Sequence, residues 1–281
     1  MDYSAWIAAC AVLLMLALLP GCNLQYRMLY ETDTSLPSQR AVEESDLRFW
    51  PGGEQVYRGF IGHAETGNPK GTFIVFHGNG GTAFDREYYA KAFGSLGYRV
   101  ILAEYPCYGG RKGDLGETAF VKDAHETVRL VHELYGGPVY LLGESLGAGV
   151  VAAVAASTPV PVAGVVLMTP WDTLRSVAQH HFRIVPVRLF LKDSYDNVAN
   201  LSKFRGKIAV VGAGRDGIIP IRHARNLFGS LSSPVKRMWV IEKAGHNDWL
   251  LYMDQALWQE IVDFVSGAAG RTAGEGGEKE L

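Results

Sequence analysis

The sequence predicts an α/β domain built on a mostly parallel, doubly wound sheet. Short apolar runs alternate along the chain with amphipathic segments, and most of these runs are continuous rather than alternating in polarity. Continuous runs are typical of parallel strands, because helices cover both faces of such a sheet. Repeated strand–helix units indicate the doubly wound arrangement. The predicted strands span residues 72–76, 99–103, 138–142, 162–168, 207–211 and 236–241.

An antiparallel hairpin is expected before the first parallel strand. Residues 45–49 and 55–61 have strand-like composition, and Pro51-Gly52-Gly53 between them indicates a turn. We therefore predict a hairpin at the edge of the sheet. Helices are predicted at about 83–96, 117–135, 145–157, 222–231 and 249–265.

The predicted domain spans residues 45–266 and carries a small cap insertion at about 171–206. Residues 22–44 are polar and mixed, as expected for a tether. The tail at 267–281 is rich in Gly, Ala and Glu, which predicts disorder. The cap is short and apolar in patches, so we expect an open groove with an apolar lining.

Composition excludes several functional classes. The chain has 281 residues, 48% of them hydrophobic and 20% charged, which is typical of a globular protein with a full core. Its formal net charge is −2 and no basic cluster stands out, so nucleic acid is a poor candidate partner. Three cysteines indicate neither a disulfide framework nor a zinc site.

The N-terminal segment, residues 1–21, is predicted to be a signal peptide or membrane anchor. Residues 6–20 are almost wholly apolar but short of the roughly 20 residues that cross a bilayer. The segment ends in Gly21-Cys22 and resembles a bacterial lipoprotein cleavage site, which implies lipidation of Cys22 and attachment to the bacterial cell envelope. Asp2 and the absence of a basic start depart from that pattern. The alternative is an uncleaved anchor with the domain in the cytoplasm, which Arg27 favours.

Ser145 is the candidate nucleophile. It lies in Gly143-Glu144-Ser145-Leu146-Gly147, directly after a predicted buried strand and at the start of an Ala-rich helix. In this strand–turn–helix context the G-x-S-x-G pattern presents a serine hydroxyl on a strained turn, and the small residues two before and two after it avoid neighbouring backbone. The helix N-terminus favours developing negative charge. The alternative is a chance match in a glycine-rich chain.

A second glycine-rich loop follows the strand at 72–76. His77-Gly78-Asn79-Gly80-Gly81 can turn backbone amides toward the nucleophile. In hydrolases with this pattern, one oxyanion donor comes from such a loop and the other from the residue after the nucleophile. We therefore predict the backbone N–H groups of Asn79 and Leu146 as the oxyanion hole, with a structural role for His77.

Two late loops supply the remaining groups of a catalytic triad. Asp216 follows the strand at 207–211, and His246 follows the strand at 236–241. A serine hydroxyl needs an imidazole to take its proton, and the imidazole needs a carboxylate to fix its tautomer. All three residues come after predicted strands, so they can converge at the carboxyl edge of the sheet. We predict Ser145, Asp216 and His246 as nucleophile, orienting acid and base.

Alternatives exist for two of these roles. Asp172 follows another strand and could act as the acid, whereas Asp248 lies close to His246 and is better explained as a helix N-cap. Three further histidines fall on predicted helices and are expected at the surface: His125, His132 and His223. No histidine pair has metal-ligand spacing with a carboxylate, so we predict no catalytic metal.

Together these motifs resemble those of the alpha/beta-hydrolase superfamily, in particular its small-capped bacterial serine esterase-like and serine-aminopeptidase-like members. The resemblance covers roughly residues 45–265. It rests on HGNGG, EYPCYGG, GESLG, GRDGIIP and AGHND. Cys107 departs from the pattern, because a glycine is common at its position; it could shape the pocket.

The resemblance implies hydrolysis of carboxylic esters or thioesters through an acyl-enzyme on Ser145, with no cofactor. Peptidase or amidase chemistry and acyl transfer would use the same triad, and a non-catalytic binding protein with this fold remains a further alternative. The expected partners are a small-molecule ester or acyl substrate and, through the N-terminus, a membrane. The sequence does not predict an oligomeric state.

Overall fold

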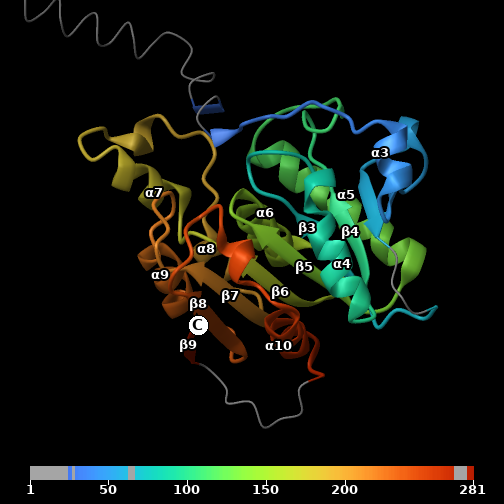
Figure 1. Ribbon diagram of the computed structural model, residues 1–281. Helices are drawn as coiled ribbons and strands as arrows, with labels where there is room; N and C mark the ends of the chain where they lie inside the picture. Colours follow the sequence, from blue (N-terminus) through green and yellow to red (C-terminus); the bar gives the residue numbers. More distant parts are fainter. Residues whose placement is uncertain (1–24, 27–28, 63–66, 269–276) are drawn as a thin grey trace, which may run out of the picture.

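The computed structural model describes residues 25–26, 29–62, 67–268 and 277–281. They form a nine-stranded sheet in the order β1-β2-β4-β3-β5-β6-β7-β8-β9. The hairpin β1–β2 pairs antiparallel and adds to β4 antiparallel, and every later pairing is parallel. The predicted α/β class, the mostly parallel sheet and the edge hairpin are confirmed (Figure 1). The strands are β1 Leu47–Trp50, β2 Gly59–Gly62, β3 Thr72–Phe76, β4 Arg99–Ala103, β5 Val139–Glu144, β6 Val162–Met168, β7 Lys207–Ala213, β8 Lys236–Ile241 and β9 Glu278–Glu280.

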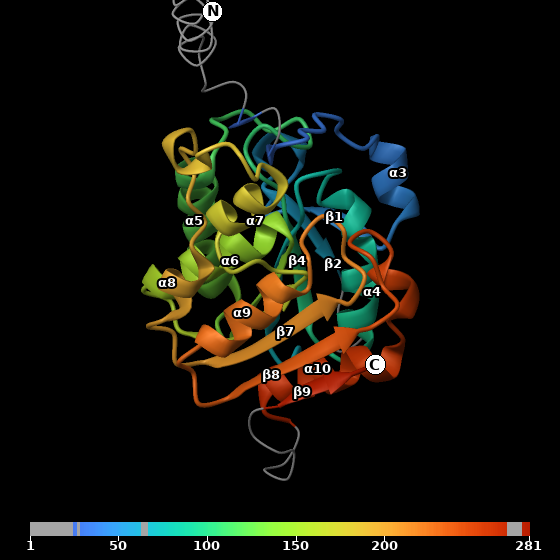
Figure 2. The ribbon, with the colours of Figure 1, turned by 90° about the vertical axis from the view of Figure 1, so that its left-hand side faces the viewer.

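Helices cover both faces of the sheet. Figure 2 shows α5 and α6 on one side and α4 on the other. The α-helices are α3 Gln39–Glu44, α4 Glu87–Ser95, α5 Glu117–Tyr135, α6 Leu146–Ser157, α7 Leu174–His181, α8 Asn197–Leu201, α9 Arg222–Ser230 and α10 Gln255–Ser266. Four short 3-10 helices complete this set: η1 Glu54–Val56, η2 Phe84–Arg86, η3 Val187–Leu189 and η4 Trp249–Tyr252.

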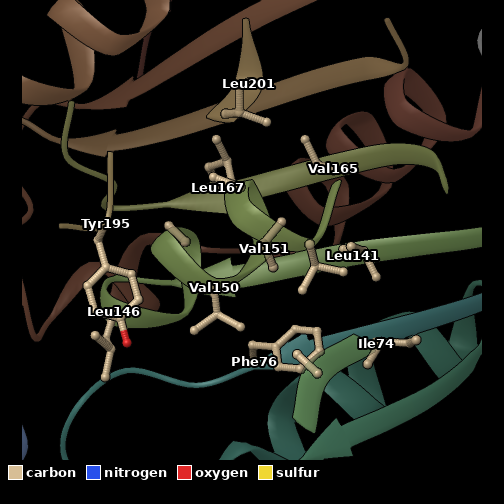
Figure 3. Packing of buried hydrophobic residues seen from close by; sticks show 14 of the residues in the cluster. Ile74, Phe76, Leu141, Leu146, Val150, Val151, Val165, Leu167, Tyr195 and Leu201 are labelled. Atoms are coloured by element: carbon tan, nitrogen blue, oxygen red, sulfur yellow. The ribbon is translucent and has the colours of Figure 1, made fainter. Parts of the chain in front are cut away.

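Two hydrophobic cores follow from this layering, because alternate residues of each strand face opposite sides. On β3, Ile74 and Phe76 join the core beneath α5 and α6, whereas Phe73 and Val75 join the core beneath α4 and α10. Figure 3 shows the first core, in which β3, β5 and β6 contribute side chains that contact α6. The sheet is therefore buried on both faces, as its continuous apolar runs predict.

The terminal segments differ from the predictions. The predicted tail was expected to be disordered, but Glu278–Glu280 pairs with β8 as strand β9, so that prediction is wrong for these residues. The exposed edge of β8 offers unpaired backbone groups that even a polar strand can satisfy. The predicted tether also packs onto the domain in its described part, where Tyr30 is only 4% exposed. Residues 1–21 and Cys22 lie outside the described residues.

Two smaller differences concern helices. The helix predicted at 249–265 is divided, because Asp254 accepts a hydrogen bond from the Leu257 N–H and starts α10 as its N-cap. The predicted cap corresponds to α7, η3 and α8 with their connections. Among the described residues, no helix is both long and apolar enough to span a bilayer.

Candidate active site

Ser145 lies on the tight turn between β5 and α6. Its backbone has φ 53° and ψ −110°, which is unusual for a residue with a side chain. The turn requires two close backbone approaches: a Cβ at Gly143 would collide with the Gly147 carbonyl, and one at Gly147 would collide with the Phe76 carbonyl. The Ser145 N–H donates to the Met168 carbonyl at 2.9 Å, which anchors the turn to β6.

The three residues predicted as a triad form one hydrogen-bonded chain. The His246 Nε2 atom lies 3.0 Å from the Ser145 Oγ atom, and the His246 Nδ1 atom lies 2.7 Å from the Asp216 Oδ2 atom. An Nδ1–H that donates to the carboxylate leaves Nε2 as the acceptor for the serine hydroxyl. The Asp216 side chain is only 1% exposed, and the His246 side chain is 11% exposed. The arrangement can therefore activate the hydroxyl by proton transfer to the imidazole.

Asp216 is held by its own loop after β7. Its Oδ1 atom accepts hydrogen bonds from the Ile218 N–H at 2.8 Å and the Ile219 N–H at 2.6 Å. These two bonds leave Oδ2 directed at His246. The loop thus fixes the carboxylate before it meets the imidazole.

The competing acids have other partners. Asp172 accepts a hydrogen bond from the His223 Nδ1–H at 2.9 Å, and its other side-chain hydrogen bonds within the described residues come from Thr173, Ser176 and Asn226 rather than from His246. Asp248 accepts from the Gly245 N–H at 2.5 Å and is the N-cap residue of η4. The prediction that His223 lies at the surface is wrong. It is 3% exposed, because α9 turns this face of the helix toward the base of the cap.

The predicted oxyanion loop lies beside the nucleophile. A Cβ at Gly78 would lie 3.7 Å from the Ser145 Cβ, so the loop backbone approaches the serine closely. Within the described part of the chain, the backbone N–H groups of Asn79 and Leu146 donate no hydrogen bond, so both are free to serve as oxyanion donors. His77 is 1% exposed, and its ring lies 2.8 Å from Glu104 and 2.7 Å from the Gly78 carbonyl.

An ionic contact that the sequence analysis missed joins this loop to the nucleophile turn. Arg86 donates at 3.1 Å both to the Gly80 carbonyl and to the Glu144 carboxylate. Tyr88 and Tyr89 donate to the other carboxylate oxygen of Glu144 at 2.9 and 3.2 Å. Burial is the largest influence and works to lower the pKa of Arg86, but the charge and hydrogen bond of Glu144, together with Tyr88 and Tyr89, outweigh it and raise that pKa. The variable position of the G-x-S-x-G pattern is thus a structural acid here.

The segment predicted as a tether crosses the same region. We call its described residues, 25–26 and 29–36, the N-terminal strap. The Leu29 carbonyl accepts from the Asn79 side-chain amide at 3.3 Å, and the Asp33 carbonyl accepts from the Gly109 N–H at 2.8 Å. The Tyr30 hydroxyl donates to Asp193 of the cap at 2.7 Å. The strap therefore touches the oxyanion loop and the cap together, which no local pattern indicated.

The backbone conformation of Cys107 explains why a glycine is common at this position. Its φ is 67°, in the left-handed region that favours glycine. Its thiol donates to the Gly113 carbonyl at 3.1 Å. Burial, followed by the Asp114 charge, raises the pKa of this thiol, which keeps it in the less reactive protonated form.

Two large hollows of the described surface lie away from Ser145, Asp216 and His246. One of about 950 Å³ lies between α5 and the loop after β4, and includes Pro106, Lys112 and Thr118. One of about 700 Å³ lies beside α3 and β1. In the ranges that the structure describes, no three His, Cys, Asp or Glu residues gather closely enough to hold a metal ion.

Comparisons with known proteins extend these observations. A family model described as serine aminopeptidase, S33, of the Hydrolase_4 type, matches residues 67–192. The uncharacterized protein Rv2307c of Mycobacterium tuberculosis is 30% identical over 203 residues, which are 70% of each chain. Lysophosphatidylserine lipase ABHD12 of Macaca fascicularis is 26% identical over 182 residues, 58% of this chain and 46% of that protein.

Solved structures share the fold at low sequence identity. The Pyrococcus furiosus esterase Pf2001 superposes with a TM-score of 0.63 at 14% identity, over 86% of this chain and 99% of its own. The Paleococcus ferrophilus monoacylglycerol lipase superposes with a TM-score of 0.54 at 18% identity, over 70% of this chain and 96% of its own. The chain thus shares its overall fold with these two solved structures.

Proposed function

Because the chain belongs to the alpha/beta-hydrolase superfamily, we propose that it is a serine hydrolase that cleaves carboxylic esters or thioesters through an acyl-enzyme on Ser145. The observation that carries this proposal is the unbroken hydrogen-bond chain from Ser145 Oγ through His246 to Asp216. The names of several relatives and neighbours, which include esterases and lipases, support ester substrates.

In the first half-reaction the Ser145 Oγ attacks the carbonyl carbon of the ester while His246 Nε2 takes the hydroxyl proton. The Asp216 carboxylate stabilises the imidazolium that forms. The N–H groups of Asn79 and Leu146 donate to the negative oxygen of the tetrahedral intermediate. His246 returns its proton to the departing alcohol or thiol, and the acyl group stays on Ser145.

In the second half-reaction a water molecule replaces the departed group. His246 takes one proton of the water as its oxygen attacks the acyl carbon, and then returns that proton to Ser145 Oγ as the acid leaves. Both half-reactions therefore begin with the His246 Nε2 atom free to accept a proton.

A peptidase function is the second candidate, favoured by the description of the matching family model as a serine aminopeptidase. The same atoms would cleave an amide, with His246 protonating the departing amine. A panel of nitrophenyl esters of increasing chain length and of aminoacyl nitroanilides separates the two. Faster turnover of the esters supports the ester hydrolase, and turnover of the anilides alone contradicts it.

The first test is labelling of the purified protein with a fluorophosphonate, in parallel with ester hydrolysis. Wild type should be labelled and active, Ser145→Ala should lose both, and Ser230→Ala should keep both because its exposed hydroxyl only caps a helix carbonyl. No labelling of a folded wild type would overturn the proposal and favour a non-catalytic binding protein.

We further propose that the N-terminus attaches the protein to the bacterial cell envelope through a lipid on Cys22. This proposal rests on the apolar residues 6–20 and the Gly21-Cys22 pair. Mass spectrometry of the mature N-terminus tests it: a lipidated cysteine supports the proposal, and an intact Met1 supports the uncleaved anchor instead.

A further inference from the structure

Exposed apolar side chains of the described chain concentrate on the cap and on the loops that carry Asp216 and His246. Eleven large hydrophobic residues are at least 41% exposed, and eight belong to these three segments. On the cap they are Phe182, Ile184, Val185, Leu189 and Phe190, and on the two loops they are Ile218, Leu251 and Tyr252. Apolar patches of this kind mark sites of interaction, because burial in water-free surroundings stabilises them.

The outer part of the cap, residues 182–190, is an ordered structure that we call the cap tip. The Gln179 side chain donates to the carbonyls of Phe182 and Arg183 at 2.9 and 3.2 Å, which fixes the turn after α7. Val187 is buried and anchors η3, whereas Ile184 is 98% exposed. The apolar side chains of the tip therefore point outward from a fixed backbone.

The cap tip also carries positive charge. The sequence contains four Lys or Arg residues and no Asp or Glu between Asp172 and Asp193. Arg183 and Arg188 lie on the tip, are exposed, and have no carboxylate within 4.0 Å among the described residues. An exposed apolar surface flanked by unpaired cations complements an anionic lipid surface.

The start of the described chain lies against the base of the same cap. The Gln25 side chain donates to Asp193 at 2.9 Å and accepts from the Lys192 N–H at 2.6 Å. Cys22, the proposed lipid site, precedes Gln25 by three residues, which span at most about 11 Å. Figures 1 and 2 show the cap and the first described residues at one end of the molecule.

We propose that the cap tip docks on the surface of an anionic phospholipid bilayer. The apolar side chains of the tip enter the boundary between headgroups and acyl chains, and Arg183 and Arg188 contact lipid phosphates. The proposed lipid on Cys22, three residues before Gln25, enters the same bilayer and holds the cap against it. The His181 ring lies 2.8 Å from the Ile218 carbonyl, so docking brings the Asp216 loop to the lipid surface. The proposed hydrolase would then meet substrates that reside in the bilayer.

Fluorescence quenching tests docking without any measurement of activity. The full chain is reconstituted into phosphatidylcholine vesicles that contain phosphatidylglycerol and a brominated phosphatidylcholine. Trp6 is replaced by Phe in every variant, since the other tryptophans are at most 4% exposed within the protein. The brominated lipid should quench the fluorescence of the tryptophan introduced by Ile184→Trp. It should not quench that of Val56→Trp, which lies exposed on the hairpin. Equal quenching of both probes would overturn the proposal.

Hydrolysis in the same vesicles provides a second test, and this arm alone rests on the proposed function. Replacing both Ile184 and Leu189 by Asp should slow hydrolysis of a long-chain ester in the bilayer about tenfold or more, because two side chains leave an apolar environment. Hydrolysis of a soluble short-chain nitrophenyl ester should be unchanged. The matched Val56→Asp, Leu134→Asp variant should retain both rates. Equal loss on both substrates would contradict docking, whereas no activity in wild type would contradict the proposed function.

Discussion

Ser145 combines local backbone strain with a hydrogen bond to His246. Its positive φ costs on the order of 1–3 kcal/mol in a residue with a side chain. The cost is tolerated because the turn is fixed by β5 before it and α6 after it, and because the Ser145 N–H donates to the Met168 carbonyl of β6. This turn conformation places the Ser145 hydroxyl at the end of β5, within hydrogen-bond distance of His246.

Asp216→Asn tests the role of the orienting acid. An amide still accepts from the Ile218 and Ile219 N–H groups, so the melting temperature should change little. It cannot hold His246 in the required tautomer, so kcat should fall about 10³- to 10⁴-fold. The matched Asp248→Asn change should leave kcat near the wild-type value. An equal loss in both variants would show that the loops matter for folding rather than for the tautomer.

The cap and α9 are joined through one buried carboxylate. Asp172 accepts hydrogen bonds from Ser176 at 2.7 Å, from His223 at 2.9 Å and from Asn226 at 3.2 Å. Burial works to raise the pKa of Asp172, but the hydrogen bonds from Ser176, the Thr173 N–H and the other partners outweigh it and lower that pKa. The Asp172 carboxylate thus joins α7, at the base of the cap, to α9 through hydrogen bonds.

Low pH should weaken these hydrogen bonds of Asp172 and reduce the free energy of unfolding. Because the folded pKa of Asp172 is lowered, the unfolded chain binds its proton first, and the associated stability is present above about pH 4 and is lost as the pH falls further. In Asp172→Asn, unfolding by urea should show lower stability at pH 7 and a shallower decline between about pH 5 and 3. If the free energy of unfolding falls equally with pH in wild type and in Asp172→Asn, Asp172 is not the source of this pH dependence.

The N-terminal strap is held by a buried cluster. Burial, with the neighbouring Tyr195 and Asp193, raises the pKa of Tyr30 and keeps its hydroxyl a donor. The Glu117 N–H also donates to Asp193, at 3.1 Å, so α5, the cap and the strap meet at one carboxylate. Contacts of this kind make the strap part of the domain.

Tyr30→Phe measures this attachment. Loss of one hydrogen bond to a buried carboxylate should reduce the free energy of unfolding by about 2 kcal/mol. Tyr252→Phe is the control, since Tyr252 is 42% exposed and should shift stability by less than about 0.5 kcal/mol. Urea unfolding measures both variants, and equal stabilities would mean that the strap is not anchored there.

The two cores of the molecule share the sheet as their common wall. β5 lies near the middle of the strand order, between β3 and β6, and carries the nucleophile turn at its end. Side chains from it enter both cores, with Leu141 on one face and Leu142 on the other. Packing at this strand therefore supports the fold and the position of Ser145 together.

Leu141→Ala should consequently be costly. The residue is fully buried, so truncation should reduce the free energy of unfolding by about 2–5 kcal/mol through lost burial and a residual cavity. The control is Leu134→Ala on the exposed end of α5, with an expected change within about 0.5 kcal/mol. Stability is measured by thermal and urea unfolding, and an equal loss in Leu141→Ala and Leu134→Ala would contradict the two-core description.

Local patterns were sufficient to predict most of the sheet and the proximity of three residues that the structure joins by hydrogen bonds. The strands β3, β4, β6 and β8 have the predicted bounds, because each is a continuous apolar run between polar turns. Ser145, Asp216 and His246 could be predicted because each follows a strand, and parallel strands end at one edge of the sheet. Their hydrogen bonds follow from that topology.

Tertiary structure alone decided the contacts between distant polar residues. Glu144 with Arg86, Tyr30 with Asp193 and Asp172 with His223 are separated by 58, 163 and 51 residues. Such pairs produce no periodic pattern in the sequence, because each hydrogen bond depends on two distant side chains and not on the residues that flank them. Strand β9 escaped prediction for a related reason: its Glu-Lys-Glu sequence has no apolar face, and it forms because the edge of β8 supplies the pairing partner.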